Sequence, residues 1–411
     1  MKNRRPELLI PASSLEVLKT AVIFGADAVY IGGEAFGLRA KAKNFSMEDM
    51  REGIEFAHEH GVRVHVTVNI LAHNDDLEGV EEYLRELKEI GPDALIIADP
   101  AIFEMAKEIC PEIERHISTQ ANNTNYGTYR FWWKQGAKRV VSARELSLKE
   151  IKEIRERIPE EMEIESFIHG AMCISYSGRC LLSNYFTGRD ANQGACTHPC
   201  RWKYAVVEET RPGEYMPVYE NERGTYIFNS KDLCMIEHIP EMIDAGIDSF
   251  KIEGRMKTAL YVATVARTYR KAIDDYLEDP EKYKANMPWY LDQISNCTYR
   301  QFTTGFYFGK PSEESQIYDS NTYVKEYTYL GIIGGEKDGM YRIEQRNKFS
   351  VGETIEIMKP DGRNIEVTVR RIVDEDGTEQ ESAPHPKQVL YIDFGEEAEQ
   401  YDILRRAEPE T

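Results

Sequence analysis

A regular alternation of apolar, strand-like runs and helix-like stretches fills the first 170 residues of this 411-residue chain. Residues 7–11 are apolar, residues 15–24 have helical spacing, and residues 28–32 form the next apolar run. Such units recur about every 20 to 35 residues, as expected for strands that are joined by helices. The alternation predicts a parallel sheet in which each strand is followed by a helix.

An eighth strand–helix unit appears later in the chain. A helix is expected over 235–245, a strand over 249–253 and a long helix over 257–276. Eight such units predict an α/β fold of the (β/α)8 TIM-like barrel type. A doubly wound sheet is the main alternative, but no Gly-x-Gly-x-x-Gly motif follows the first strand.

In a barrel of this type, function belongs at the C-terminal ends of the strands. The residues expected there are polar or glycine: Gly32, Gly33, Glu34, Asn69, Asp99, Thr119, Gln120, Ser142, Arg144, His169, Glu253 and Arg255. Glu34, His169 and Glu253 are candidates to move protons during catalysis. A structural ion pair at a strand end is the competing interpretation for each charged residue.

The rest of the chain breaks the barrel rhythm. The barrel is expected over 1–276, with an insertion at about 171–230 whose short strands and turns indicate a hairpin region. Residues 277–322 have weak periodicity and are expected to be a linker that packs on the barrel. Residues 323–411 contain short stretches that alternate apolar and polar residues, which predicts a small antiparallel β-barrel or sandwich.

Cysteines cluster directly after the seventh strand. Four of them follow the spacing Cys-x6-Cys-x15-Cys-x3-Cys: Cys173, Cys180, Cys196 and Cys200. A further cysteine, Cys234, follows after 33 intervening residues. Four thiolates bind either zinc or an iron–sulfur cluster. Because structural zinc sites use short paired spacings, the wide gaps favour a cluster over zinc. Buried cysteines without a metal are the third interpretation, and they suit Cys110 and Cys297 best.

Charge and hydropathy limit the classes of partner. The net charge of −20 argues against non-specific binding of nucleic acid, although it allows a local basic patch. The N-terminus lacks the apolar region of a secretory signal, and no apolar run approaches the length of a membrane helix. We therefore expect a cytoplasmic protein in a reducing compartment, with no membrane partner.

Several motifs resemble those of one known family. The barrel region resembles the collagenase-like peptidase family of unknown catalytic type, a U-type peptidase family, and the resemblance continues through residues 229–234 and 250–257. Its most specific part is residues 165–173 and 178–183. Within that family, residues 188–196 and 200–204 resemble the prephenate-dependent tRNA uridine hydroxylases. The resemblance implies an enzyme that hydroxylates the wobble uridine of tRNA to 5-hydroxyuridine without molecular oxygen.

The resemblance also implies cofactors and partners. A 4Fe-4S cluster is implied on Cys173, Cys180, Cys196 and Cys234, with Cys200 as a competing fourth ligand. Cys234 is preferred because it follows a strand-like segment and opens a helix, whose positive end favours a thiolate. Prephenate is the implied co-substrate, and Arg144 and Arg255 are the candidates to bind its carboxylates. The implied partners are tRNA and, as a second candidate, a paralogous subunit.

Three alternatives remain from the sequence. A related hydroxylase would act on ribosomal RNA or on a ubiquinone precursor. A non-enzymatic metal scaffold would work only with a partner. A cysteine-type peptidase would pair a thiol with His169 or His198, but it would leave four further cysteines unexplained, and neither His-Glu-x-x-His nor Gly-x-Ser-x-Gly is present.

Overall fold

The computed structural model describes residues 5–33, 36, 44–172, 180–189, 196–197, 199, 205–206, 216–217, 229–296, 301–309, 316–317 and 327–408. Its residues form two compact units. One unit contains the parallel strands and all four described cysteines. The other contains residues 20–26, the helices after residue 257 and the C-terminal strands. Glu34, Cys173 and Cys200 lie outside the described residues.

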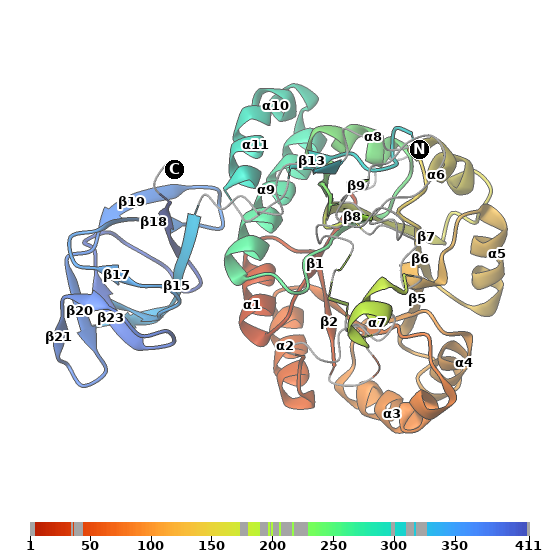
Figure 1. The fold of residues 1–411 in the computed structure, drawn as a ribbon, viewed down its shortest axis with the longest axis horizontal. Helices are drawn as coiled ribbons and strands as arrows, with labels where there is room; N and C mark the ends of the chain where they lie inside the picture. The colour runs from red at the N-terminus through yellow and green to blue at the C-terminus, as the bar shows by residue number, and fades with distance from the viewer. Residues whose placement is uncertain are drawn as a thin grey trace. The chain divides into compact units, whose positions relative to one another are not determined.

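Eight parallel strands close into a barrel in the first unit, which confirms the predicted fold (Figure 1). Neighbouring strands pair in parallel in chain order, and the last pairs with both the seventh and the first. The strands are β1 (Glu7–Pro11), β2 (Ala28–Gly32), β3 (Arg63–Val68), β4 (Ala94–Ile97), β5 (Glu114–Ile117), β6 (Arg139–Val141), β7 (Glu163–Gly170) and β12 (Ser249–Ile252).

Helices alternate with these strands as predicted. They are α1 (Leu15–Ile23), α2 (Met47–Glu59), η1 (Asn74–Leu77), α3 (Val80–Ile90), α4 (Pro100–Ile109), η2 (Thr119–Ala121), α5 (Tyr126–Gln135), α6 (Leu148–Arg155), η4 (Ile236–His238) and α8 (Ile239–Asp244). Side-chain caps fix where several begin, because an oxygen of Ser46, Asp99, Asn125 or Ser147 accepts from an N–H of the first turn. These local signals explain why the sequence predicts most boundaries to within a few residues.

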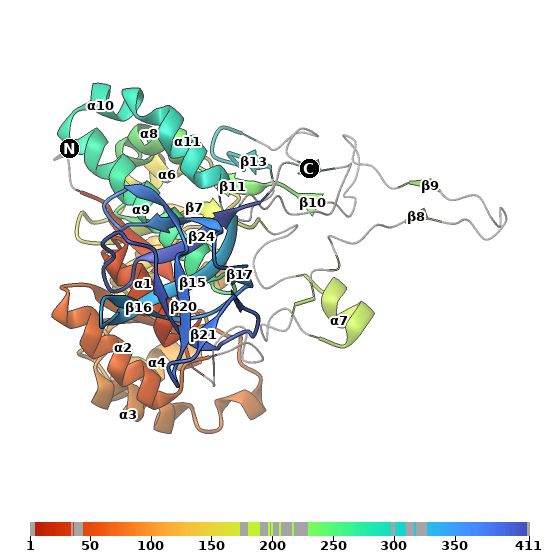
Figure 2. The same ribbon diagram turned by 90° about the vertical axis from the view of Figure 1, so that its left-hand side faces the viewer.

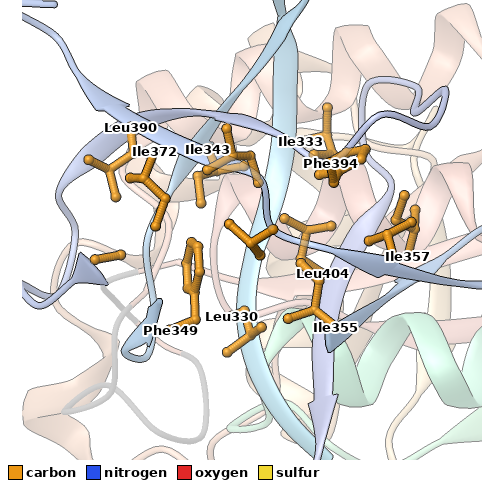
Figure 3. Close-up of a cluster of buried hydrophobic side chains, with 14 residues drawn as sticks. Leu330, Ile333, Ile343, Phe349, Ile355, Ile357, Ile372, Leu390, Phe394 and Leu404 are labelled. Carbon is orange, nitrogen blue, oxygen red and sulfur yellow. The ribbon is translucent and has the colours of Figure 1, made fainter. Parts of the chain in front are cut away.

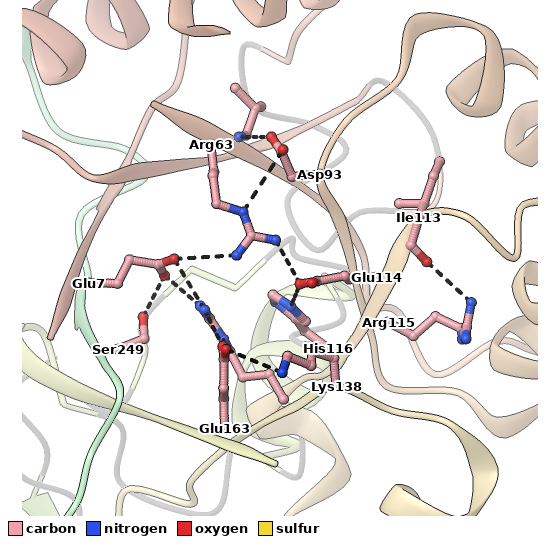
Figure 4. A network of polar contacts seen from close by, with 12 residues as sticks. Glu7, Arg63, Asp93, Ile113, Glu114, Arg115, His116, Lys138, Glu163 and Ser249 are labelled. Atoms are coloured by element: carbon pink, nitrogen blue, oxygen red, sulfur yellow. Dashed lines mark hydrogen bonds and ion pairs between the residues drawn. The ribbon is translucent and has the colours of Figure 1, made fainter. Parts of the chain in front are cut away.

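The barrel interior near the start of the strands is charged rather than apolar. Arg139 on β6 is 2% exposed and contacts carboxylates from β1 and β7, namely Glu7, Glu163 and Glu165. Figure 4 shows how the network continues outward to Arg63, Glu114 and His116. Burial alone would raise the pKa of Glu7, but Arg139 holds it well below its usual range. The network therefore keeps Glu7 ionised inside the protein.

Strand β7 extends past β6 and gains a new neighbour there. β6 pairs with β7 as far as Glu165, whereas β7 continues to Gly170. The free edge is taken by β11 (Asp232–Cys234), which runs antiparallel to β7, and β13 (Phe302–Thr303) pairs with β11 (Figure 2). Because an unpaired edge leaves backbone groups without hydrogen bonds, this addition stabilises the end of β7.

The insertion contributes short elements. They are α7 (Leu182–Thr187), the antiparallel pair β8 (Ala205–Val206) and β9 (Met216–Pro217), and β10 (Asn229–Ser230), which pairs with β14 (Gln316–Ile317). The β8–β9 pair falls where the sequence indicates a hairpin. A third strand-like stretch in that region, residues 225–228, lies outside the described residues.

The second unit combines three helices with an antiparallel sheet. The helices are α9 (Ala259–Glu278), α10 (Pro280–Ala285) and α11 (Met287–Ser295). The segment 277–322, expected from its weak periodicity to be a linker, thus contains two helices, and both pack on α9. Asp275 on α9 accepts hydrogen bonds from Asn286 and Tyr290, which joins the three helices.

The predicted C-terminal β domain is present as an eight-stranded antiparallel sheet among the described residues. Its strands are β15 (Tyr327–Lys337), β16 (Met340–Glu344), β18 (Thr354–Met358), β19 (Asn364–Thr368), β20 (Arg371–Asp374), β21 (Glu379–Gln380), β23 (Val389–Asp393) and β24 (Ile403–Ala407). The short strands β17 (Phe349–Ser350) and β22 (Ser382–Ala383) pair separately. Figure 3 shows their shared core, with Phe349, Ile372 and Leu404 fully buried.

Candidate active site at the barrel mouth

An ion pair joins the ends of β6 and β12. Nη2 of Arg144 lies 2.9 Å from Oε2 of Glu253, and the Arg144 guanidinium stacks over the Phe167 ring at 3.9 Å from its centre. Both charged side chains are largely buried, and Oε1 of Glu253 accepts from the Gly254 N–H at 3.1 Å. A carboxylate from the protein therefore occupies Arg144, so a substrate carboxylate would have to replace Glu253.

Arg255 occupies a separate part of the mouth. Its guanidinium donates to Oγ1 of Thr67 at 3.0 Å and to Oδ1 of Asn44 at 3.1 Å. Gly32 at the end of β2 makes room for it, because a Cβ there would lie 2.5 Å from Nη2 of Arg255. The structure thus brings Gly32 and Arg255 together, as expected for strand ends. The Arg255 guanidinium fills the space that a side chain at residue 32 would need, which explains the glycine.

Amide and hydroxyl groups meet at the ends of β3 and β5. Nδ2 of Asn69 lies 3.2 Å from both Oγ of Ser118 and Oε1 of Gln120, and the Ser118 hydroxyl also donates to Gln120. All three side chains are buried. Asp99 has a different role, since its carboxylate caps α4. The sequence points to Asn69 and Gln120 by their position after a strand, whereas Ser118 gives no separate signal.

Residues 301–309 support the end of β7, a role that sequence reasoning missed. The Tyr307 hydroxyl donates to the Phe167 carbonyl, and the Leu148 N–H donates to the Tyr307 carbonyl at 3.0 Å. Phe302 lies against His169, with 5.7 Å between the ring centres. The aromatic residues of this stretch are the sequence signal for such packing. They did not predict it, because the stretch has no clear helical or strand periodicity.

His169 and Cys234 are paired across β7 and β11. They face each other directly in the antiparallel register, and His169 is 1% exposed while Cys234 is half-buried. Cys234 ends β11, and the following helical turn begins only at Ile236. The expectation that Cys234 opens a helix is therefore wrong, and strand pairing rather than a helix end positions its thiol.

Two other cysteine-bearing segments are tied together. Cys180 lies just before α7, whose Ser183 hydroxyl accepts from the Thr197 N–H at 3.0 Å and contacts the Thr197 hydroxyl at 3.1 Å. This holds the residue after Cys196 against the helix that follows Cys180. Cys110 is different: its buried thiol donates to the Ala106 carbonyl, and burial raises its pKa to about 11, as expected for a structural cysteine.

The thiols suit a metal centre of the predicted kind. Two lie on segments joined by hydrogen bonds, and Cys234 lies opposite the end of β7, the strand that leads within a few residues to Cys173. Soft thiolate donors select zinc or iron–sulfur clusters rather than magnesium or calcium. The donor set therefore fits the cluster that the resemblance implies, although zinc uses the same ligands.

A second group of metal-type donors lies in the barrel interior. One donor atom each from His65, His116 and Glu165 lies within 4.8 Å of the others, and all three residues are buried. Both Glu165 oxygens are already bound, one by Lys251 at 2.6 Å and one by Arg139 at 3.0 Å. These buried cations would repel a divalent metal ion. The group is therefore part of the structural network.

Comparison with known proteins places the chain in a family. The model of peptidase family U32 matches residues 13–317, and the model of the peptidase family U32 C-terminal domain matches residues 325–405. The chain belongs to peptidase family U32. This membership confirms the family resemblance that the cysteine region and its flanking motifs indicate.

Named relatives of this U32 protein share much of its length. The tRNA hydroxylation protein P1 of Bacillus subtilis (strain 168) is 43% identical over 406 residues, which cover 98% of the chain and 95% of the relative. The tRNA hydroxylation protein P2 of the same organism is 38% identical and covers 74% of the chain and 98% of the relative. The 23S rRNA 5-hydroxycytidine C2501 synthase of Escherichia coli (strain K12) is 38% identical over 68% of the chain and 41% of the relative. The names of the two Bacillus subtilis relatives agree with the tRNA-hydroxylase branch that the motifs indicate.

Membrane insertion was not expected from the sequence. Among the helices that the structure describes in this U32 protein, none combines the length and apolar character needed to cross a bilayer.

Proposed function

We propose that this U32 protein is an iron–sulfur enzyme that hydroxylates the wobble uridine of tRNA to 5-hydroxyuridine, without molecular oxygen and with prephenate as the donor. The observation that carries the proposal is the 43% identity to a protein named for tRNA hydroxylation, over 98% of the chain. The polar barrel mouth, and Cys234 opposite the end of β7, are consistent with such an enzyme, since barrel enzymes act at this end of the strands.

The proposed cofactor is a 4Fe-4S cluster held by Cys173, Cys180, Cys196 and Cys234. When bound, it would supply one-electron chemistry or a site for the oxygen-donating ligand. The pairing of Cys234 with the end of β7 supports Cys234 as the fourth ligand in preference to Cys200. The protein would hold the cluster beside the mouth, close to the strand ends that carry the polar side chains.

Arg144 is the proposed carboxylate-binding residue. In the proposed cycle, a carboxylate of prephenate replaces Glu253 on the Arg144 guanidinium, which can form two parallel hydrogen bonds with it. Glu253, released from its ion pair, then becomes available as a proton acceptor. Arg255 is the second candidate for carboxylate binding, and Glu34 is a further candidate to move protons. Phe167 keeps the Arg144 guanidinium in place throughout.

The RNA must present its uridine outside the anticodon-loop stack for this chemistry. Tyr185 on α7 is 83% exposed and its ring contacts that of Phe186 edge-on. The adjacent Leu181 is 73% exposed, so this short helix presents apolar surface close to Cys180. We assign to Tyr185 the stacking contact with a base of the loop, because aromatic stacking is the usual way to bind an extruded base. Tyr176 and Trp202, two further aromatic residues of the cysteine region, lie outside the described residues.

A paralogous subunit is the proposed protein partner. Bacillus subtilis has two relatives, named P1 and P2, that both match this chain. A purified chain that is inactive alone and gains activity with such a paralogue would establish the partnership. Activity of the chain by itself would exclude a requirement for it.

Two alternatives follow from specific observations. The relative named for 23S rRNA makes ribosomal RNA a second candidate substrate. The opposition of His169 and Cys234 is also what a cysteine–histidine dyad requires, so a peptidase remains a second candidate activity. If ribosomal RNA is the substrate, cells that lack this protein should lack a hydroxylated cytidine in their rRNA. If the protein is a peptidase, purified protein without iron should cleave gelatin.

One experiment tests the proposal directly. The chain is purified anaerobically, its iron and sulfide are measured, and it is expressed in a bacterial strain that lacks its own tRNA uridine hydroxylases. Mass spectrometry of tRNA and rRNA nucleosides then shows 5-hydroxyuridine in tRNA with wild type but not with Cys180→Ala, whereas Cys110→Ala remains active. A strain whose tRNA lacks 5-hydroxyuridine despite iron-loaded wild-type protein would overturn the proposal.

A further inference from the structure

We propose that an outer face of the barrel binds the phosphate backbone of tRNA. This cation face consists of Arg130 and Lys134 on α5, of Arg157 after α6, and of the Tyr126 ring that both arginines contact. The inference rests on the proposed function in one respect, namely that the substrate is a tRNA. It goes beyond that function because it assigns a contact with tRNA to residues outside the barrel mouth.

The sequence around α5 lacks acidic residues. The chain has 71 Asp and Glu residues against 51 Lys and Arg, yet residues 115–144 contain six Lys and Arg and no Asp or Glu. A chain with a net charge of −20 repels a polyanion at long range, so a tRNA has to be held by a locally positive region. The acid-free stretch includes the whole of α5, which therefore suits that role.

The side chains of the cation face lie on one exposed stripe. Tyr126, Arg130 and Lys134 follow each other at intervals of four residues, which places them on the same face of the helix. Both cations are exposed, and Tyr126 is 39% exposed. Arg157, also exposed, joins them from the segment after α6, and α6 packs beside α5 on the outside of the barrel (Figure 1).

Two guanidinium groups of this face are held close together around one ring. The guanidinium carbon of Arg157 lies 4.8 Å from the centre of the Tyr126 ring, and that of Arg130 lies 5.5 Å from it. Nε of Arg130 also donates to the Arg157 carbonyl at 2.6 Å. The two positive charges are therefore no more than about 10 Å apart, which is about one Debye length at 0.1 M salt.

Within the described part of the chain, no carboxylate neutralises the two arginines. Arg130 and Arg157 contact the Tyr126 ring and a backbone carbonyl there, but neither forms an ion pair. Like charges at this separation repel each other, and an anion bound between them relieves the repulsion. Guanidinium groups form paired hydrogen bonds with phosphate oxygens. Because both cations lie over the Tyr126 ring, the face fits the RNA backbone better than a stacked base.

The test measures how tRNA binding depends on salt. Each phosphate that a protein contacts releases counterions, so the slope of log Kd against log salt concentration reports the number of such contacts. Full-length tRNA transcripts are titrated with wild type, Arg157→Gln and Arg130→Gln/Arg157→Gln by fluorescence anisotropy, between about 50 and 200 mM salt. We expect the slope to decrease by about 0.7 to 0.9 for each arginine that is removed.

A charge-matched control separates local contact from net charge. Arg85→Gln on α3 also removes one positive charge, but Arg85 pairs with Glu81, and the slope should stay at the wild-type value. The decrease in the arginine variants should be the same for a transcript with another wobble base, because phosphate contacts carry no sequence information. Only the double variant loses the hydrogen bond to the Arg157 carbonyl, so Arg157→Gln decides the result if the double variant is unstable.

The possible outcomes separate this inference from the proposed function. A wild-type slope in Arg157→Gln would overturn the contact at the cation face, while nucleoside analysis tests the proposed function separately. If Arg157→Gln binds tRNA normally but no longer associates with a paralogous subunit, the face is a protein interface and the RNA contact is overturned. A wild-type protein that neither binds tRNA nor forms 5-hydroxyuridine would overturn both.

Discussion

Arg144 and Glu253, separated by 109 residues in the chain, form a 2.9 Å ion pair at the mouth of the barrel. The pair brings together a residue predicted to bind a carboxylate and one predicted to move protons. If a donor carboxylate exchanges with Glu253, the two residues should respond to substitution in opposite ways. Glu253→Gln removes the competing charge, whereas Arg144→Lys removes the planar group that binds a carboxylate through two bonds.

We therefore expect Arg144→Lys to raise KM for prephenate by about tenfold, which corresponds to about 1.4 kcal/mol of lost binding. Glu253→Gln should lower KM, because no charged group then competes for Arg144. It should also lower kcat, because the glutamine side chain cannot accept a proton. Steady-state hydroxylation assays on a tRNA anticodon stem-loop separate the two constants. Equal losses of kcat with unchanged KM in both variants would show that the pair is only structural.

Two buried histidines make stability depend on pH. Burial lowers the pKa of His65 and of His116 well below the usual value, so both are neutral in the folded protein. The unfolded chain binds protons on them below about pH 6.5, whereas the folded chain does not. The free energy of unfolding should therefore have its full value above about pH 6.5. It should decrease as the pH falls below 6.5, by about 1.4 kcal/mol per pH unit for each histidine.

Urea unfolding of the barrel at pH values between about 5.5 and 7.5 measures this slope. In His65→Leu the slope should fall by about half, because one of the two histidines no longer takes up a proton on unfolding. The variant is compared with His60→Leu, in which an exposed histidine is lost and the slope should stay the same. A wild-type midpoint that does not change across this range would contradict neutral burial of the pair.

The charged barrel interior predicts a large difference between two arginines. Arg139 is 2% exposed and contacts three carboxylates, whereas Arg85 forms a pair with Glu81 in which both side chains are mostly exposed. Arg139→Ala removes the cation that the three buried carboxylates share and should cost about 3–5 kcal/mol of unfolding free energy. Arg85→Ala should cost at most about 0.5 kcal/mol. Denaturant unfolding measures both, and similar values would show that the network is not a stabilising element.

The barrel could be predicted because its signals are local. Strands such as β1 and β2 are short apolar runs with a helix between them, so each can be recognised from its own residues. The sequence does not predict strand β24, because Arg405 interrupts its apolar pattern. That arginine is fully buried, pairs with Glu356 and stacks on the Tyr327 ring at 4.1 Å. Only the tertiary partners make a charge at that position compatible with a central strand.

The strand ends that carry the candidate residues could be predicted, but the pairings between their side chains could not. The rule that barrel strands end at the functional face identifies Arg144, His169 and Glu253 as neighbours. It does not show that Arg144 binds Glu253, because the register and the side-chain directions decide that contact. Likewise, β11 has three residues and pairs with a strand some 60 residues earlier, so no local pattern places Cys234 opposite His169. Such non-local pairings are set by the closed sheet.

The contact between Gly32 and Arg255 gives a prediction for the other arginine of the mouth. Gly32→Ala places a Cβ 2.5 Å from Nη2 of Arg255, so the guanidinium must move. Thr67→Val removes a hydrogen bond to Arg255 at similar volume and serves as the milder change. If Arg255 binds the donor, Gly32→Ala should raise KM by about tenfold or more and Thr67→Val by less, at about 1 kcal/mol per lost bond. Unchanged KM in both variants would exclude Arg255 from donor binding.

Tyr185 provides a test of RNA contact that is independent of the cluster. Its ring is 83% exposed, so Tyr185→Ala should leave the stability of the protein unchanged. If the ring stacks on a base, the substitution should cost about 1–3 kcal/mol, which weakens binding of an anticodon stem-loop by about 5-fold to 150-fold. Phe131→Ala, at a ring that is 53% exposed on α5, is the matched control and should bind normally. Fluorescence anisotropy at fixed salt measures both, since affinity for RNA depends on ionic strength. Equal affinity of the two variants would show that α7 does not contact the loop.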